Sequence, residues 1–171
     1  LGHLAFQWED FYDPNYGEDG KEWDGSGSWD VMAGGSYNGN GHRPCHPAAL
    51  HKSQHHWIEV TPVTSSGQHI LQPYTPTSGQ VLKLISPKYR SGQYLLLENR
   101  AKTGFDSDLP GEGLLVWKVD ESADMFAPEK PALLLVQADG RRQLQTPDDW
   151  NTGDAGDPFP GSSNRTDLSE R

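Results

Sequence analysis

Cysteine is almost absent from this chain of 171 residues, whose one copy is Cys45. A single cysteine excludes a disulfide within the chain and says nothing about the compartment in which the protein works. Cys45 lies in the loop sequence HRPCHP, where flanking prolines leave no helix N-terminus that could activate the thiol. We therefore do not expect Cys45 to act as a catalytic nucleophile.

Basic side chains and long apolar runs are also scarce. The chain has 14 Lys and Arg against 24 Asp and Glu, which gives a formal net charge of −10. Because nucleic-acid binding requires clustered positive charge, this balance argues against nucleic acid as a partner. No apolar run is long enough to span a bilayer, and no signal peptide is present, as expected if the protein's N-terminus lies upstream of Leu1.

The hydrophobic fraction is low as well, at 33%, whereas 19 Gly and 13 Pro together make 32 residues. A chain of this length suits one domain with its own buried core. Its composition predicts that much of that domain consists of turns and irregular loops.

Candidate zinc ligands lie in the first block of the chain, LGHLAFQWEDFYD. Helical zinc proteases carry H-E-x-x-H, in which two histidines one turn apart bind the metal and the Glu is the general base. The opening letters LGH match only the last three of that pattern. A lone histidine such as His3 is more often solvated than metal-bound. Here, however, Asp10 follows it, and WDVMAGGSYNG then places Met32 in a Gly-rich turn, as in metzincins.

On these motifs the chain resembles the secreted bacterial metalloproteases of the immune inhibitor A type, a metzincin-like family. The similar blocks follow one another through nearly the whole chain: LGHLAFQWEDFYD at 1–13, GSWDVMAGGSYNG at 27–39, HPAALHKSQHHW at 46–57, LLLENRAKTGFDSDLPGEGLLVWKVDE at 95–121, LLVQADGRRQL at 134–144 and GDAGDPFPG at 153–161. The resemblance implies that His3 is the second zinc histidine, Asp10 the third protein ligand and Met32 the residue of the turn beneath the metal. It also implies that the first histidine and the catalytic Glu precede Leu1.

Three positions depart from the family's pattern. Gln7 stands where relatives usually have Gly, so it either accepts left-handed backbone strain of about 1 kcal/mol or indicates a changed turn. Glu9 stands where relatives often have Pro. Strict metzincin spacing also makes Glu9 a rival ligand to Asp10, which is preferred because DFYD matches the family's D-x-Y-D run. Lys118 stands where relatives often carry His.

The function that the resemblance implies is that of a zinc-dependent endopeptidase. It would hydrolyse peptide bonds of a protein or peptide substrate with a zinc-activated water. We expect a secreted, extracellular, monomeric protein. Since the general base and one ligand are missing, the 171-residue chain by itself is predicted to be inactive. Tyr37 follows the Met-turn, but its spacing differs from that of metzincins that use a tyrosine there, and it is not assigned a catalytic role.

Five histidines lie between positions 42 and 56. His51 and His55 are spaced to share one face of a helix. No Glu follows His51 and no third ligand is evident, so we do not predict a second zinc site.

Acidic loops make calcium a second candidate metal. In the loop 13–28, Asp13, Asp19 and Asp24 offer oxygen ligands, but their spacing does not match an EF-hand, which favours a solvated loop. The acidic C-terminal segment 139–171 either binds calcium or forms a mobile tail. The candidate calcium ligands there and at the preceding strand end are Asp120, Glu121, Asp139, Asp154 and Asp157.

The predicted fold class is α+β, mostly β. Residues 1–57 are expected to be the remnant of a metzincin-like core: the end of the active-site helix at 1–4, the Met-turn, and a short helix at 46–56. Pro47 should occupy that helix's first position, with Ala48, Ala49, Leu50 and Ser53 facing the sheet and His51, Lys52 and His55 exposed.

A β-rich subdomain with long loops should follow over residues 58–171, within the same structural unit. Its strands are predicted at 57–63, 69–74, 80–86, 93–99, 113–120 and 132–139. The two that flank KTGFDSDLPGEG should be neighbours.

An alternative function is that of a noncatalytic, calcium-stabilised β module for adhesion or glycan binding. In that case HLAFQWED is a degenerate relic of a zinc site, which Gln7 and Glu9 favour slightly.

Overall fold

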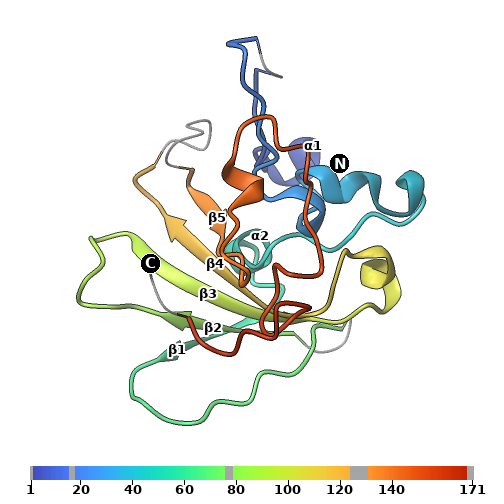
Figure 1. Cartoon of the computed structure of the whole chain (residues 1–171). Helices are drawn as coiled ribbons and strands as arrows, with labels where there is room; N and C mark the ends of the chain where they lie inside the picture. Colours follow the sequence, from blue (N-terminus) through green and yellow to red (C-terminus); the bar gives the residue numbers. More distant parts are fainter. Residues whose placement is uncertain (1, 16–17, 76–78, 124–130, 169–171) are drawn as a thin grey trace.

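The chain forms an α+β fold, mostly β, built on one five-stranded mixed sheet in the order β1-β2-β3-β4-β5 (Figure 1). The computed structural model describes residues 2–15, 18–75, 79–123 and 131–168. The strands are β1 Glu59–Val63, β2 Gln80–Leu84, β3 Gln93–Arg100, β4 Gly113–Asp120 and β5 Leu133–Leu135. The helices are α1 Gly2–Phe6 and α2 Ala49–Gln54, with 3-10 turns η1 Gly27–Trp29, η2 Gly34–Gly41, η3 Gly104–Asp108 and η4 Gln143–Gln145.

Strands β3 and β4 form the centre of the sheet. They pair antiparallel along their whole length, from Gln93 opposite Asp120 to Arg100 opposite Gly113, which confirms that these strands are neighbours. The loop between them is too long for a tight hairpin and contains η3. The apolar residues in the middle of both strands are buried in succession, as expected for strands covered on both faces.

The sheet's remaining pairs are parallel for β1 with β2 and antiparallel for β2 with β3 and β4 with β5. Five of the six predicted strands are therefore present, although β5 is shorter than its predicted range. The prediction of a strand over 69–74 is wrong. Pro73 cannot donate to a ladder, Ile70 is 72% exposed, and the segment makes one isolated bridge, from Pro73 to Asn99.

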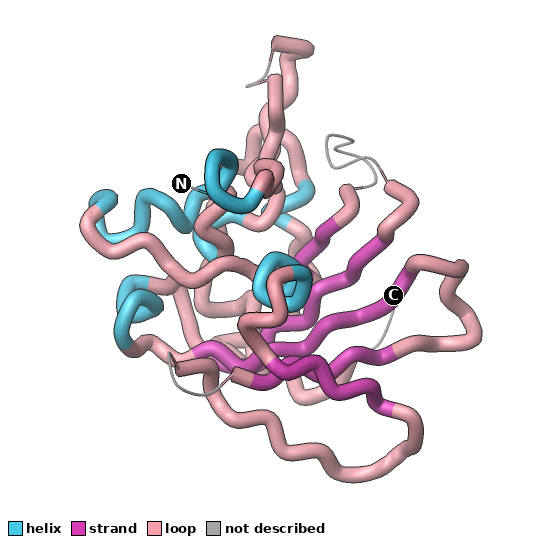
Figure 2. The backbone as a smooth tube through the Cα atoms, turned by 180° about the vertical axis from the view of Figure 1, so that it is seen from behind, coloured by secondary structure: helices cyan, strands magenta, loops and turns pink. Residues whose placement is uncertain are grey.

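Helix α2 lies against the sheet, behind it in Figure 1 and in front of it in Figure 2. It begins at Ala49, so Pro47 precedes the first helical position rather than occupying it. The prediction that His51 and Lys52 are exposed is wrong, because both side chains are buried. The helix is covered on a second side, where His51 stacks on the ring of Trp8, while Lys52 pairs with Glu98 of β3.

One hydrophobic core joins the two predicted parts of the chain. Trp8, Phe11 and Met32 from the N-terminal part belong to the same buried cluster as Trp117 and Leu133 from the sheet. The two parts therefore pack as one unit. Among the described residues, no helix has both the length and the apolar character needed to cross a bilayer.

Candidate metal centre

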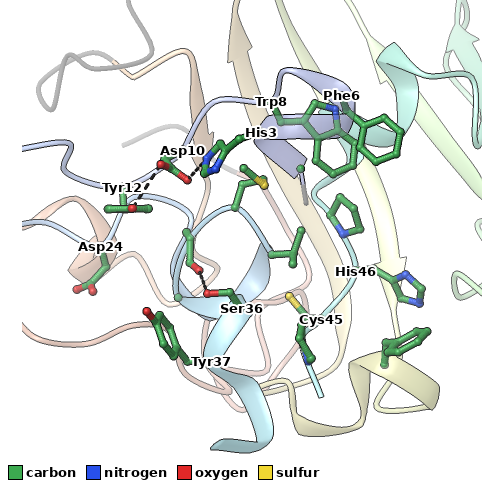
Figure 3. A pocket seen from close by; sticks show the side chains of 18 of the residues that line it. His3, Phe6, Trp8, Asp10, Tyr12, Asp24, Ser36, Tyr37, Cys45 and His46 are labelled. Carbon is green, nitrogen blue, oxygen red and sulfur yellow. Dashed lines mark hydrogen bonds and ion pairs between the residues drawn. The ribbon is translucent and has the colours of Figure 1, made fainter. Parts of the chain in front are cut away.

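His3 and Asp10 meet at the rim of a cleft (Figure 3). His3 Nε2 and Asp10 Oδ1 are 2.8 Å apart, and the Tyr12 hydroxyl donates a hydrogen bond to Asp10 Oδ2 at 3.3 Å. The side chains of His3 and Asp10 are 56% and 28% exposed. An imidazole nitrogen and a carboxylate oxygen thus converge at a site that solvent and a ligand can reach.

The turn that brings them together depends on Gln7. Its φ is +56°, in the left-handed region, and its amide donates a hydrogen bond to the carbonyl of His3 at 3.1 Å. This is the usual way of ending a helix with a left-handed residue, a position that Gly fills without strain. The sequence left two alternatives for Gln7, left-handed strain or a changed turn. The structure has the first, so Gln7 ends the helix in the conformation that Gly would adopt.

Met32 lies directly beneath α1. A β-carbon placed on Gly2 would come within 2.5 Å of Met32 Sδ, so the underside of the helix rests on the thioether. The amide of Phe11 donates a hydrogen bond to the carbonyl of Met32 at 3.0 Å, which fixes the residue that follows Asp10. The Met32 turn thus supports both candidate ligands.

Asp30 holds the Met32 turn in place from below. Its buried Oδ1 accepts hydrogen bonds from the amides of Met32 at 3.2 Å and Ala48 at 3.1 Å. The second bond ties this turn to the start of α2. Glycine at position 35 allows the close packing here, because a β-carbon would collide with Cys45 Sγ and with the carbonyl of Asp30.

The structure brings Asp10, and not its rival Glu9, to His3. Asp10 lines the cleft, whereas Glu9 is exposed and does not line it. Lys118 is exposed on β4 and is also absent from the cleft wall.

The cleft has a volume of about 780 Å³ and contains polar groups that the sequence did not single out for it. Asp24 lines it, and burial, followed by the charges of Glu22 and Asp149, raises the pKa of its carboxyl. A shifted acid in a cleft is typical of a functional site. Tyr37 and His46 line the same space, and burial lowers the pKa of His46.

The positions of Asp24 and His46 in the sequence do not indicate that they line this cleft, whereas Tyr37 was considered for a role there because it follows the Met-turn. Tyr12, which also lines the cleft, does have a signal in the sequence, since it belongs to the DFYD run that singled out Asp10.

His51 and His55 belong to an aromatic cluster behind the cleft. The His51 ring stacks between those of Trp8 and Phe11, with centroids 4.5 and 4.7 Å away. His55 lies edge-on to the ring of Phe6, at 5.2 Å. The two histidines thus pack against the segment that bears Asp10.

Cys45 lines the cleft but is buried. Burial raises the pKa of its thiol to about 12, although the charge of Arg100 opposes the rise. A thiol that stays protonated at neutral pH is a poor nucleophile, in agreement with the sequence interpretation.

The acidic residues of the loop 13–28 point to different partners. Asp13 is buried and accepts a hydrogen bond from the amide of Asn15, and Asp19 accepts one from the amide of Lys21. With Asp24 in the cleft, these three carboxylates do not meet among the residues that the structure describes.

The five candidate calcium ligands divide into two groups. Asp139, Asp154 and Asp157 place one carboxylate oxygen each within 4.8 Å of one another. Asp120 and Glu121 lie where β4 ends. Phe159, two residues after Asp157, pairs with Leu114 near the beginning of β4, so the three aspartates lie towards the opposite end of the strand. The expectation of one site from all five residues is wrong, since the length of the strand separates them.

Comparison of the chain with protein-family models, with curated proteins and with solved structures finds no match.

Proposed function

We propose that this chain is part of a zinc-dependent endopeptidase, with His3 and Asp10 as two of the metal's ligands. The observation that carries the proposal is the pair of donor atoms 2.8 Å apart at the rim of a cleft, with the helix that bears His3 packed at Gly2 on the sulfur of Met32. The N-terminal part, up to residue 57, is then the remnant of a metzincin-like core.

The donor set suits zinc. Zinc binds imidazole nitrogen and carboxylate oxygen at about 2.0–2.2 Å, so tetrahedral ligand atoms stand roughly 3.3 Å apart. His3 and Asp10 need to separate by only about half an ångström from their hydrogen-bonded distance to reach that value. Both side chains are partly exposed and can make this adjustment. The hydrogen bond from Tyr12 orients the carboxylate, as outer partners of metal ligands commonly do.

Each group has a defined task in this proposal. When bound, zinc lowers the pKa of a water molecule and polarises the scissile carbonyl. His3 and Asp10 hold the ion, Met32 and Gln7 fix the turn between them, and the cleft beside them receives the peptide. The remaining histidine and the general base Glu come from residues that precede Leu1 in a longer protein, as the resemblance implies. The 171-residue chain is then inactive by itself.

Zinc titration of the chain by calorimetry tests the ligand assignment. We expect Asp10→Asn to weaken zinc binding about tenfold or more, and Glu9→Gln, which removes the same charge one residue away, to leave it nearly unchanged. His3→Ala should act like Asp10→Asn. If the 171-residue chain, which lacks the third ligand, binds zinc too weakly to measure, the same variants are titrated in a longer chain that includes the residues upstream of Leu1. Equal loss in Asp10→Asn and Glu9→Gln contradicts the assignment.

Proteolysis of an unfolded protein substrate tests the activity. A longer chain that includes the residues upstream of Leu1 should cleave the substrate in the presence of zinc and lose activity with a chelator, whereas the 171-residue chain should not cleave it. If the upstream residues contain no His-Glu pair and the longer chain stays inactive, the alternative of a noncatalytic β module is favoured.

A further inference from the structure

Three aspartates from two separate loops converge near the end of β5. Asp139 lies in the turn that follows this strand, and Asp154 and Asp157 lie in the C-terminal loop. Backbone hydrogen bonds join the loops: the amide of Ala138 donates to the carbonyl of Asp157 at 2.8 Å, and that of Asp139 to the carbonyl of Gly156 at 3.1 Å. The carboxylates are therefore held together by the backbone.

This arrangement is electrostatically costly without a counter-charge. Three carboxylate oxygens lie within 4.8 Å of one another, and like charges at such distances repel strongly away from bulk water.

A second observation points to a missing partner for Asp139. Its Oδ2 is buried, in a side chain that is only 10% exposed, and it accepts no hydrogen bond from the residues that the structure describes. Within the described part of the chain, Asp139 Oδ2 has an ion-pair contact with Arg141 Nε, whose side chain is 68% exposed. The distance of 3.5 Å is too long for a good hydrogen bond. A buried carboxylate oxygen without a partner is expensive and rare in native proteins.

This oxygen faces the other carboxylates. A β-carbon on Gly156 would lie 2.9 Å from both Asp139 Oδ2 and Asp154 Oδ1, so these two oxygens flank the same glycine. Glycine keeps the space between them open.

We propose that Asp139, Asp154 and Asp157 bind one calcium ion. Hard carboxylate oxygens favour a hard cation, and the set contains no imidazole or thiolate to favour zinc. Loops with irregular backbone suit the flexible geometry of calcium better than the strict octahedron of magnesium. Three protein carboxylates leave positions for water and backbone carbonyls.

The site connects the C-terminal loop to the segment that carries Met32. Trp29 Nε1 donates a hydrogen bond to Asp157 Oδ2 at 2.9 Å, and the amide of Ser28 donates one to the carbonyl of Thr152 at 2.6 Å. Calcium at the aspartates therefore clamps the C-terminal loop onto the 3-10 turn η1, just before Met32. This inference does not depend on the zinc site.

Calorimetry and thermal unfolding of the whole chain test the proposal. After treatment with a chelator, we expect one calcium ion to bind per chain, with a dissociation constant of about 10⁻⁵–10⁻³ M. A free calcium concentration ten times the dissociation constant should raise Tm by roughly 3–6 °C. No heat of binding together with no change in Tm overturns the proposal, and so does equal or tighter binding of magnesium.

Two matched variants locate the ion. Asp154→Asn should weaken calcium binding at least tenfold and abolish the rise in Tm, while its calcium-free fold, followed by circular dichroism, stays intact. Asp19→Asn removes the same charge from the other acidic loop and should bind calcium like the unmodified chain. Asp139→Asn provides a second test if Asp154→Asn fails to fold. Loss of binding in Asp19→Asn, or its retention in both Asp139→Asn and Asp154→Asn, overturns the proposal.

Discussion

Lys52 Nζ donates a hydrogen bond to Glu98 Oε2 at 2.6 Å, and both side chains are buried. The pair joins α2 to β3 beneath the cleft. Glu98 Oε1 also accepts hydrogen bonds from Trp117 Nε1 at 2.9 Å and Arg100 Nη1 at 3.2 Å. Burial lowers the pKa of Lys52, and the Glu98 carboxylate opposes that change. A buried ion pair thus joins α2, the helix next to the candidate zinc site, to the sheet.

Replacement of Lys52 by Met should strongly destabilise the fold. The substitution removes one partner of a buried ion pair and leaves a buried carboxylate, which costs about 3–5 kcal/mol in comparable cases. Urea unfolding followed by tryptophan fluorescence measures the loss. Lys118→Met removes the same charge from an exposed position of β4 and should change stability by no more than about 0.5 kcal/mol. Similar losses in the two variants would mean that the pair does not stabilise the fold.

Because of the Lys52–Glu98 pair, we expect the free energy of unfolding to depend on pH. Burial alone would raise the pKa of Glu98, but the charges of Lys52 and Arg100 lower it from 4.5 to about 2. Since the pKa is lower in the folded state, the ionised carboxylate stabilises the fold above pH 4.5, and this contribution is lost as the pH falls from 4.5 towards 2.

Urea unfolding of the unmodified chain and of Lys52→Met over this pH range isolates the effect. Other carboxylates titrate in both proteins, so the difference between the two free energies of unfolding reports on the pair. That difference should be constant near neutral pH and shrink below pH 4.5. A difference that stays constant throughout this pH range would show that Lys52 does not stabilise the ionised form of Glu98.

Short apolar runs allowed much of the sheet to be predicted from the sequence. The runs QYLLLEN and GLLVWKVD became β3 and β4, since continuous burial on both faces selects such residues. For Gln7 the sequence left two alternatives, left-handed strain or a changed turn, and the structure has the first. The convergence of His3 with Asp10 followed from the motif, whereas the metal itself remains a prediction.

Features that depend on distant partners could not be read from the sequence. Lys52 was expected to be exposed because nothing in α2 indicates that Glu98, 46 positions later, will pair with it. Asp120 was grouped with Asp139 because both offer carboxylate oxygens, Asp120 at the end of the preceding strand, but the length of β4 separates them. Asp24 was assigned to an acidic loop, and only the fold shows that it faces the cleft.

Replacement of Gln7 by Gly should stabilise the protein. Gln7 has a φ of +56°, where a side chain costs about 1 kcal/mol relative to Gly, so relief of strain should raise the free energy of unfolding by up to about that amount. Gln54→Gly, at an exposed position of α2, should instead lower it by about 0.5–1 kcal/mol. Chemical denaturation of both variants makes the comparison. If both substitutions destabilise, Gln7 is not strained in solution.

Replacement of Gly35 by Ala should disturb the turn that supports Met32. A β-carbon there would lie 2.5 Å from the carbonyl oxygen of Asp30 and would also collide with Cys45 Sγ, so the backbone must shift. Overpacking of this kind costs about 1–3 kcal/mol. Gly67→Ala provides the matched control, because a β-carbon at Gly67 has no atom within 4 Å and should leave stability unchanged or slightly higher.

Thermal unfolding of these two glycine variants measures the cost, and zinc titration shows whether it reaches the candidate ligands. Because Asp30 holds the amide of Met32, we expect Gly35→Ala to weaken zinc binding as well as to lower Tm. Gly67→Ala should alter neither property. A lower Tm with unchanged zinc affinity would mean that the Met32 turn supports the fold without positioning His3 and Asp10.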